Sequence, residues 1–346
     1  MIRAWCLWAT LVCMLGLAAC ASGAGPANVA AMMDDAGMSA PWRHWQPPID
    51  AEPARSGSDR SAQLAASGPE AVILALHGFN DYSNAFQDFA AYFQTQGVAV
   101  HAYDQRGFGA NPDRGSWPGM ARLTGDLERA VDRLRNIYRD VPLYVLGESM
   151  GGAVTIVAAT GEDALDVDGL ILSAPAVWGG QHMNVFYRLT LWFASTLAPG
   201  WALSPSGLDI QPSDNIEMLR AIGADPLVIK TTRTSAVAGL VELMDRALAS
   251  APKLDQDLLL LIGERDEIIP PGALDDFRSR LQGAAATAIS YPEGYHMLLR
   301  DLQRARVFED ILAWIRGERP GEISERARLP IDDRVPQETK VSKNNS

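Results

Sequence analysis

The sequence predicts an α/β fold, in which helices cover both faces of a doubly wound, mostly parallel sheet and a helical cap is inserted. Short apolar runs such as Ala71–Leu76 and Leu258–Ile262 lack polar alternation, as expected for strands buried on both faces. Segments with apolar residues at helical spacing separate these runs. From about residue 175 to residue 250 the alternation stops, and aromatic residues crowd together without a clear strand. This interruption predicts the cap.

The composition of the 346-residue chain excludes several classes of protein. Its hydrophobic content of 47% is ample for one large domain. A net charge of -12 argues against a nucleic-acid partner, because phosphate binding requires a basic face. Cys6, Cys13 and Cys20 all lie in the first twenty residues, so the body of the chain has no disulfide framework or cysteine zinc site. The five histidines are scattered, and their spacing predicts no metal cluster.

Residues 1–20 have the layout of a signal peptide for secretion. Arg3 precedes an apolar run up to Leu17, and small residues close the segment. Leu17-Ala18-Ala19-Cys20 also resembles a bacterial lipobox, in which the cysteine is acylated and becomes the mature N-terminus. We therefore expect a protein that is anchored to a membrane of the bacterial cell envelope, periplasmic or outer-membrane associated, through lipidation of Cys20. An ordinary cleaved signal and an uncleaved helical anchor are the alternatives.

The folded domain is expected to begin and end well inside the chain. Residues 21–37 are small, weakly patterned and contain Gly and Pro, which predicts a tether. The domain is predicted over residues 38–317, and Met38–Trp45 could form an early strand. Residues 318–346 are charged and polar, which predicts a disordered tail.

Strands and helices are predicted to alternate on both sides of the cap. The expected strands are Ala71–Leu76, Val98–Tyr103, a run ending at Gly147, Gly169–Ser173, Leu258–Ile262 and Ala286–Tyr291. The expected helices are Ser83–Thr95, Asp126–Tyr138, Ala153–Ala159, Leu274–Leu281 and Arg300–Arg316. Catalytic groups in such sheets gather at the carboxyl ends of the strands. His77, Ser149 and Ala174 fall at such ends.

The segment Pro142–Ala158 combines a strand, a sharp turn and a helix around one serine. The apolar run stops at Gly147, Ser149 follows two residues later, and a helix-compatible segment begins soon after Gly151. A nucleophile elbow has this layout, in which side chains at Gly147 and Gly151 would collide with neighbouring backbone. The helix directs free N–H groups toward negative charge forming beside the hydroxyl. We predict that Ser149 is a nucleophile; a Gly-rich turn into a core helix is the alternative.

A serine nucleophile requires a base, and the base requires a group that orients it. His296 alone among the histidines lies after every plausible acid, in a loop leaving the last strand, and it is the predicted base. Asp266 directly follows a buried strand, where its carboxylate would point into the crevice at the strand ends. Glu264 and Glu267 compete with it. Asp266 is the predicted orienting acid, because this elbow type uses the order Ser, Asp, His.

The tetrahedral intermediate of such a reaction requires two N–H donors near its oxygen. One is expected to be the backbone N–H of Met150, directly after the nucleophile. The other should come from the loop after the strand Ala71–Leu76, where Phe79 follows His77 and Gly78. Phe79 and Met150 are therefore the predicted oxyanion-hole residues.

The predicted cap has two readings. Aromatic residues at helical spacing are more often buried than functional, so additional core is the simpler one. A helical block over the strand ends would, however, roof the serine with an apolar surface that suits an acyl chain. A membrane span is disfavoured, because Arg188 interrupts the apolar run and several prolines shorten it.

Five motifs occur in the order H-G-F-x-D, D-Q-R-G-F-G, G-E-S-M-G-G, G-E-R-D and G-Y-H. Together they resemble the α/β-hydrolase superfamily over about residues 38–317, and the similarity is closest to its monoacylglycerol lipase and lysophospholipase-like branch. The resemblance implies a serine esterase or lipase that acts through an acyl-enzyme without a cofactor. It also implies a helical cap that shapes the acyl pocket.

The family's functional residues match particular positions of this sequence. Its catalytic triad falls on Ser149, Asp266 and His296, and its oxyanion donors fall on Phe79 and Met150. The chain departs from many monoacylglycerol lipases in one place. Where those proteins continue the first motif with small residues and a glutamate, Phe79-Asn80-Asp81 stands here. A preference for glycerol esters is therefore not implied.

These observations favour a membrane-tethered carboxylic-ester hydrolase that acts on lipid-like esters. A thioesterase, an acyltransferase or a peptidase would use the same acyl-serine with a different leaving group or acceptor. A third class reuses the fold as a non-enzymatic, lipid-binding envelope protein. Dehalogenase and epoxide hydrolase chemistry is disfavoured, because those relatives carry an aspartate where Ser149 stands.

Overall fold

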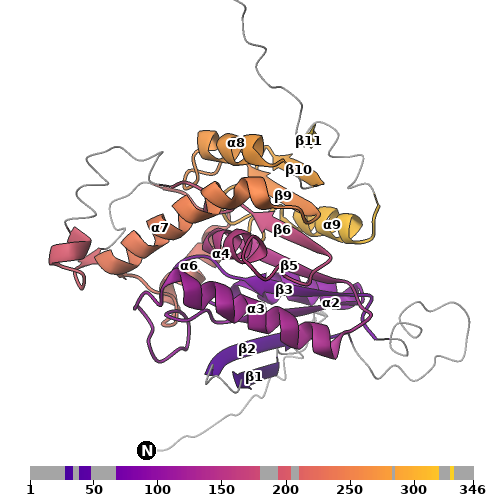
Figure 1. Ribbon diagram of the computed structural model, residues 1–346, viewed down its shortest axis with the longest axis horizontal. Coiled ribbons are helices and arrows are strands. Elements are labelled where there is room, and N and C mark those ends of the chain that lie inside the picture. The colour runs from indigo at the N-terminus through magenta and orange to yellow at the C-terminus, as the bar shows by residue number, and fades with distance from the viewer. Residues whose placement is uncertain are drawn as a thin grey trace, which may run out of the picture.

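The computed structural model describes residues 28–33, 39–47, 68–179, 194–203, 210–282, 285–318 and 328–330. Its main feature is a sheet of nine strands in the order β1-β2-β4-β3-β5-β6-β9-β10-β11 (Figure 1). The strands are β1 (Asn28–Met33), β2 (Ser39–Trp45), β3 (Ala71–Leu76), β4 (Val98–Tyr103), β5 (Leu143–Glu148), β6 (Gly169–Ser173), β9 (Leu258–Gly263), β10 (Ala286–Tyr291) and β11 (Arg328–Pro330).

The centre of the sheet is parallel, from β4 through β3, β5, β6 and β9 to β10. All residues of β3 and β4 are buried, in agreement with the apolar runs of the sequence. Because the strands are parallel, their carboxyl ends meet at one edge; Glu148 at the end of β5, for example, pairs with Ser173 at the end of β6. The loops that follow these strands therefore share one side of the molecule. The predicted fold class is confirmed.

Helices cover both faces of the sheet (Figure 1). One face packs against α3 (Met120–Ile137), α4 (Met150–Ala159), α7 (Thr234–Ser250) and α8 (Pro271–Arg280). The other face packs against α2 (Gln87–Thr95), which follows the 3₁₀ helix η1 (Ser83–Phe86), and against α9 (Arg304–Ile315). On β5, Val145 points to the first face and Leu146 to the second, as the two-residue period of a strand requires.

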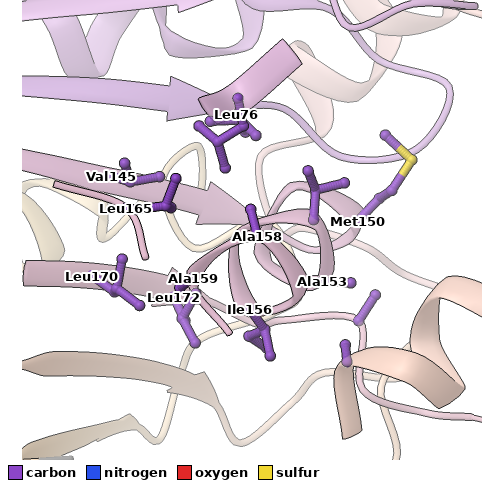
Figure 2. Close-up of a cluster of buried hydrophobic side chains, with 14 of the residues drawn as sticks. Leu76, Val145, Met150, Ala153, Ile156, Ala158, Ala159, Leu165, Leu170 and Leu172 are labelled. Carbon is purple, nitrogen blue, oxygen red and sulfur yellow. The ribbon is translucent and has the colours of Figure 1, made fainter. Parts of the chain in front are cut away.

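The core around α4 fixes the helix that follows the predicted nucleophile. Figure 2 shows Leu76 of β3, Val145 of β5 and Leu172 of β6 facing the side chains of α4. Met150 and Ile156 of α4 are completely buried in this cluster. Burial of each large side chain contributes about 1.5–3 kcal/mol. The start of α4 is therefore held firmly against the end of the parallel sheet.

The segment between β6 and β9 contains α6 (Ile216–Ala224), α7 and two short strands, β7 (Ala202–Leu203) and β8 (Thr232–Arg233). The sequence predicted no strand here, but β7 and β8 form an antiparallel pair. Strands of two residues are too short for any side-chain period, which explains the difference. The second half of α7 packs in the main core through Leu243 and Ala247. Residues 180–193, which include much of the aromatic block, lie outside the described residues.

The structure differs from the sequence prediction at both ends of the domain. β1 lies within the predicted tether, residues 21–37, and pairs with β2 in antiparallel fashion. β11 lies within the predicted tail, residues 318–346, and adds to β10. Edge strands are held by backbone hydrogen bonds, so they require no apolar pattern. The predicted signal peptide and Cys20 lie outside the described residues. In the described part of the chain, no helix combines the length and apolarity needed to cross a membrane.

Candidate active site

Ser149 occupies the turn between β5 and α4 in a strained conformation. Its φ of 52° and ψ of -114° lie where side chains other than glycine are rare. Backbone hydrogen bonds hold it there: its N–H donates to Ser173 O (3.0 Å), and its C=O accepts from Ala176 N (2.9 Å) and Ala153 N (3.2 Å). The side chain remains partly exposed. A partly exposed serine on a strained strand-to-helix turn has the geometry of a nucleophile elbow.

Steric contacts explain why positions 147 and 151 are glycine. A Cβ at Gly147 would lie 2.6 Å from the carbonyl oxygen of Gly151, and a Cβ at Gly151 would lie 2.2 Å from Leu76 O. Real Cβ atoms do not approach backbone atoms so closely. The tight passage of α4 across the ends of β3 and β5 therefore depends on glycine at both positions.

The loop that carries Phe79 approaches this elbow, and Met150 belongs to it. Met150 is the first residue of α4, so its N–H has no acceptor within the helix. Gly78, just before Phe79, lies so close to the elbow that a Cβ on it would be 3.4 Å from Ser149 Cβ. Among the described residues, the N–H of Phe79 has no backbone acceptor. An oxyanion requires two such donors, and Phe79 and Met150 remain the predicted pair.

His77 supports this loop and is not available as a base. Its Nδ1 donates to Gly78 O (2.8 Å), and its Nε2 accepts from Gln105 N (2.9 Å). The Gln105 side chain also donates to His77 O (2.8 Å). Burial lowers the pKa of His77, so the imidazole is neutral and both ring nitrogens are used.

The structure brings Asp266 and His296 together. Asp266 Oδ2 accepts from His296 Nδ1 at 2.8 Å, and both side chains are buried. Asp266 Oδ1 accepts from the N–H groups of Ile268 (2.7 Å) and Ile269 (2.9 Å), which fix the carboxylate. With its proton on Nδ1, the imidazole keeps Nε2 free to accept a proton. The pair thus has the arrangement of a base with its orienting acid.

The competing carboxylates have other partners. Glu264 accepts from the Ser290 hydroxyl (2.7 Å), and Glu267 accepts from Gln211 N (2.7 Å). Within the described residues neither forms a hydrogen bond or ion pair with His296, whose Nδ1 donates to Asp266. The geometry therefore selects Asp266 among the acids that the sequence left open.

Ser149 and His296 lie at the same edge of the sheet, after β5 and β10. Within the described residues no hydrogen bond joins the Ser149 hydroxyl to His296, so their relay stays a prediction. A neighbouring contact ties the two loops together. Arg300, four residues after His296, donates to Glu148, which directly precedes Ser149 (3.2 Å). Sequence reasoning missed this pair, because nothing in the local pattern relates residues so far apart.

Residues between β6 and β9 rest on the loops of the site. Ile229 N donates to Asn80 O (2.9 Å), next to Phe79 in the oxyanion loop. Ser213 donates to Asp301 Oδ1 (2.6 Å), just beyond the histidine loop. Burial raises the pKa of Asp301 to about 6. This segment therefore contacts two of the three loops that carry the predicted chemistry.

A recess of about 280 Å³ opens between α6 and the residues after the oxyanion loop. Met218 and Ile222 give it an apolar wall, and Tyr82 and Asn215 give it a polar one. Ser149 is not among its lining residues. The predicted acyl-chain roof over Ser149 therefore remains a prediction.

Nowhere in the described part of the chain do three or more His, Cys, Asp or Glu side chains gather as a possible metal site.

A mostly parallel sheet, a strained serine elbow after β5 and a buried Asp–His pair at the same edge define an α/β-hydrolase. The model of the serine aminopeptidase S33 family matches residues 67–303, and the chain belongs to this family. The monoacylglycerol lipase of Mycolicibacterium smegmatis is 25% identical over 249 residues, which cover 71% of this chain and 88% of that protein. Human monoglyceride lipase is 24% identical over 252 residues, covering 71% and 82%.

Solved structures support the same fold. A soluble variant of the Saccharomyces cerevisiae monoglyceride lipase, in complex with a substrate analog, superposes with a TM-score of 0.67 at 18% identity. The similarity covers 84% of this chain and 94% of that one. The predicted resemblance to the α/β-hydrolase superfamily and the predicted class of enzyme, a serine hydrolase, are confirmed.

Proposed function

We propose that the protein is a serine carboxylic-ester hydrolase that cleaves lipid-like esters through an acyl-serine intermediate. One observation carries the proposal: the buried Asp266–His296 hydrogen bond of 2.8 Å lies at the same sheet edge as the strained Ser149. The lipid-like substrate is supported by the relatives, several of which are monoglyceride lipases. The Phe79-Asn80-Asp81 sequence gives no reason to prefer glycerol esters.

The first half of the proposed reaction acylates the enzyme. His296 Nε2 takes the hydroxyl proton of Ser149 while Oγ attacks the ester carbonyl carbon. The carbonyl oxygen becomes an oxyanion that accepts hydrogen bonds from the N–H groups of Phe79 and Met150. Loss of one such donor typically costs about 2.7–4 kcal/mol of transition-state stabilisation. The bond to the alcohol then breaks, and the imidazolium returns its proton to the leaving oxygen.

The second half releases the acid. Water loses a proton to His296 and attacks the acyl carbon, and the second oxyanion occupies the same pair of donors. Collapse of this intermediate breaks the bond to Ser149 Oγ, which regains its proton from the imidazolium. Asp266 accepts from Nδ1 throughout, so it holds the ring orientation and stabilises the imidazolium.

A chain-length series of p-nitrophenyl esters on the wild type and Ser149→Ala tests the proposal. We expect the alanine variant to keep its fold and lose nearly all turnover, because the nucleophile is absent. Comparable rates in the two proteins would refute the proposal. Product analysis with water against alcohol acceptors separates hydrolysis from acyl transfer, and thioester and amide substrates test the thioesterase and peptidase alternatives.

We also propose that the enzyme is anchored to a membrane of the bacterial cell envelope through acylation of Cys20. The motif Leu17-Ala18-Ala19-Cys20 is its support. Each buried methylene of an acyl chain adds about 0.8 kcal/mol of membrane affinity, so several chains would anchor the protein firmly. Metabolic labelling with an alkyne fatty acid should mark the wild type and not Cys20→Ser. Equal labelling of both would refute the anchor and leave the hydrolase proposal standing.

A further inference from the structure

Arg300 forms a buried ion-pair fork beside the nucleophile elbow, with Asp81 and Glu148. Its Nη1 donates to Asp81 Oδ2 at 2.7 Å, and its Nη2 donates to Glu148 Oε2 at 3.2 Å. All three residues are buried. Burial alone would lower the pKa of Arg300, but the carboxylates of Glu148 and Asp81 raise it, so the guanidinium stays charged.

Each member of the fork stands next to a part of the proposed machinery. Asp81 follows Phe79 by two residues, and Glu148 directly precedes Ser149. Arg300 itself follows His296 by four residues. One planar guanidinium thereby joins the oxyanion loop, the nucleophile elbow and the histidine loop.

Sheet topology explains why such a connection matters. β3 and β5 are neighbours, so backbone hydrogen bonds already fix the oxyanion loop relative to the elbow. β10 lies three positions beyond β5, after β6 and β9. At a strand spacing of about 4.8 Å, the histidine loop starts about 14 Å from the elbow strand. Within the described residues, the ion pairs of Arg300 with Asp81 and Glu148 connect the histidine loop to the oxyanion loop and the elbow across this distance.

The backbone around Arg300 transmits its position to His296. Arg300 N donates to Met297 O at 2.8 Å, which closes a turn directly after His296. Arg300 O accepts from the side chain of Asn215 at 3.0 Å. At the other end, Asp81 Oδ1 accepts from Tyr82 N (2.8 Å), so the carboxylate is oriented as well. Movement of the guanidinium would therefore displace the loop that carries the base.

Burying the three charges of the fork costs desolvation free energy. Two carboxylates share one cation, and Glu148 Oε1 and Arg300 Nε have no hydrogen-bond partner within the described residues. Buried ion pairs are weak stabilisers, because desolvation of the charges offsets their attraction. Replacing a buried ion pair with apolar side chains of similar volume is often neutral or stabilising in other proteins. Stability alone therefore does not account for three buried charges beside the elbow.

We propose that Arg300 is a positioning residue, which holds His296 and the oxyanion loop in register with Ser149 through Glu148 and Asp81. The proposal rests on the proposed function, since it concerns the same site. Lysine keeps the charge but lacks the planar fork, and so cannot reproduce both contacts at once. Because a displacement of about 1 Å can cost about a hundredfold in rate, loss of the fork should slow turnover.

Arg300→Lys and Arg304→Lys form a matched pair for the test. Arg304 lies on the same segment and also pairs with a carboxylate, Asp88 (3.2 Å), but about a third of its side chain is exposed. The measurement is kcat and KM for p-nitrophenyl butyrate, with active sites titrated by a fluorophosphonate. Titration separates loss of folded protein from slower turnover per site. A merely structural role would lower the number of active sites and leave kcat per site unchanged.

We expect Arg300→Lys to lower kcat per site by at least about tenfold with KM within about twofold, and Arg304→Lys to match the wild type. An unchanged kcat per site in Arg300→Lys would overturn the proposal. If this variant does not fold, Glu148→Gln keeps the Asp81–Arg300 pair, and an unchanged kcat per site there would overturn it equally. If Ser149→Ala kept the turnover of the wild type, the proposed function would be refuted instead.

Discussion

His101 makes the stability of this protein dependent on pH in a measurable way. It lies buried on β4, where Trp42 Nε1 donates to its Nδ1 (3.1 Å) and its Nε2 contacts the Tyr138 hydroxyl (3.2 Å). A ring that accepts at Nδ1 and donates from Nε2 is neutral. Burial, and to a lesser extent the neighbouring His44, lowers the pKa of His101 from 6.5 to about 3.

The free energy follows from proton linkage. Between pH 7 and pH 5 the unfolded chain protonates this imidazole, whereas the folded protein holds it neutral. The stability linked to His101 is therefore complete above about pH 6.5 and is lost progressively as the pH falls toward 3. With these pKa values, the loss between pH 7 and pH 5 is about 2 kcal/mol.

Urea unfolding of the wild type and His101→Gln at pH 7 and pH 5 measures this contribution. Glutamine does not titrate, and the other ionisable groups are common to both proteins. The free energy of unfolding should therefore fall by about 2 kcal/mol more in the wild type than in the variant. An equal fall in both proteins would refute the assignment of His101 as a buried neutral imidazole.

Three substitutions test the site and its supports. Asp266→Asn should leave the melting temperature nearly unchanged but lower kcat by about 10⁴-fold, because it favours the wrong tautomer of His296; a rate near wild type would exclude the orienting role. Gly151→Ala, whose Cβ would lie 2.2 Å from Leu76 O, should cost about 3 kcal/mol in urea unfolding, whereas Gly223→Ala in α6, with open space around it, should not destabilise; equal effects would contradict the steric account. Gly239→Val, whose Cβ would lie 2.1 Å from Trp117 Nε1, should displace that indole and alter the tryptophan fluorescence, and an unchanged spectrum would count against the packing described.

The central strands and the elbow could be predicted from the sequence, since their signals are local. Ala71–Leu76 and Val98–Tyr103 are strands with the predicted bounds, because both faces are buried and the runs are uniformly apolar. The serine turn could be predicted from the glycines at positions 147 and 151, where a Cβ would collide with neighbouring backbone. Asp266 was selected by chain order, and it is the carboxylate that contacts His296.

Features that depend on residues far apart in the chain could not be predicted from the sequence. β1 and β11 pair through backbone atoms at the edges of the sheet, where side chains carry little pattern. The last helix was expected from Arg300, but α9 begins only at Arg304, and Leu302 before it is 66% exposed. The fork of Arg300 joins residues 219 and 152 positions apart, and no periodicity relates them.

The most direct test of the central claim is peptide mapping by mass spectrometry after treatment with a fluorophosphonate. We expect one phosphonyl adduct, on Ser149, which is absent in Ser149→Ala and forms far more slowly in His296→Ala. An adduct on another residue, or labelling of Ser149 at the same rate without His296, would contradict the central claim.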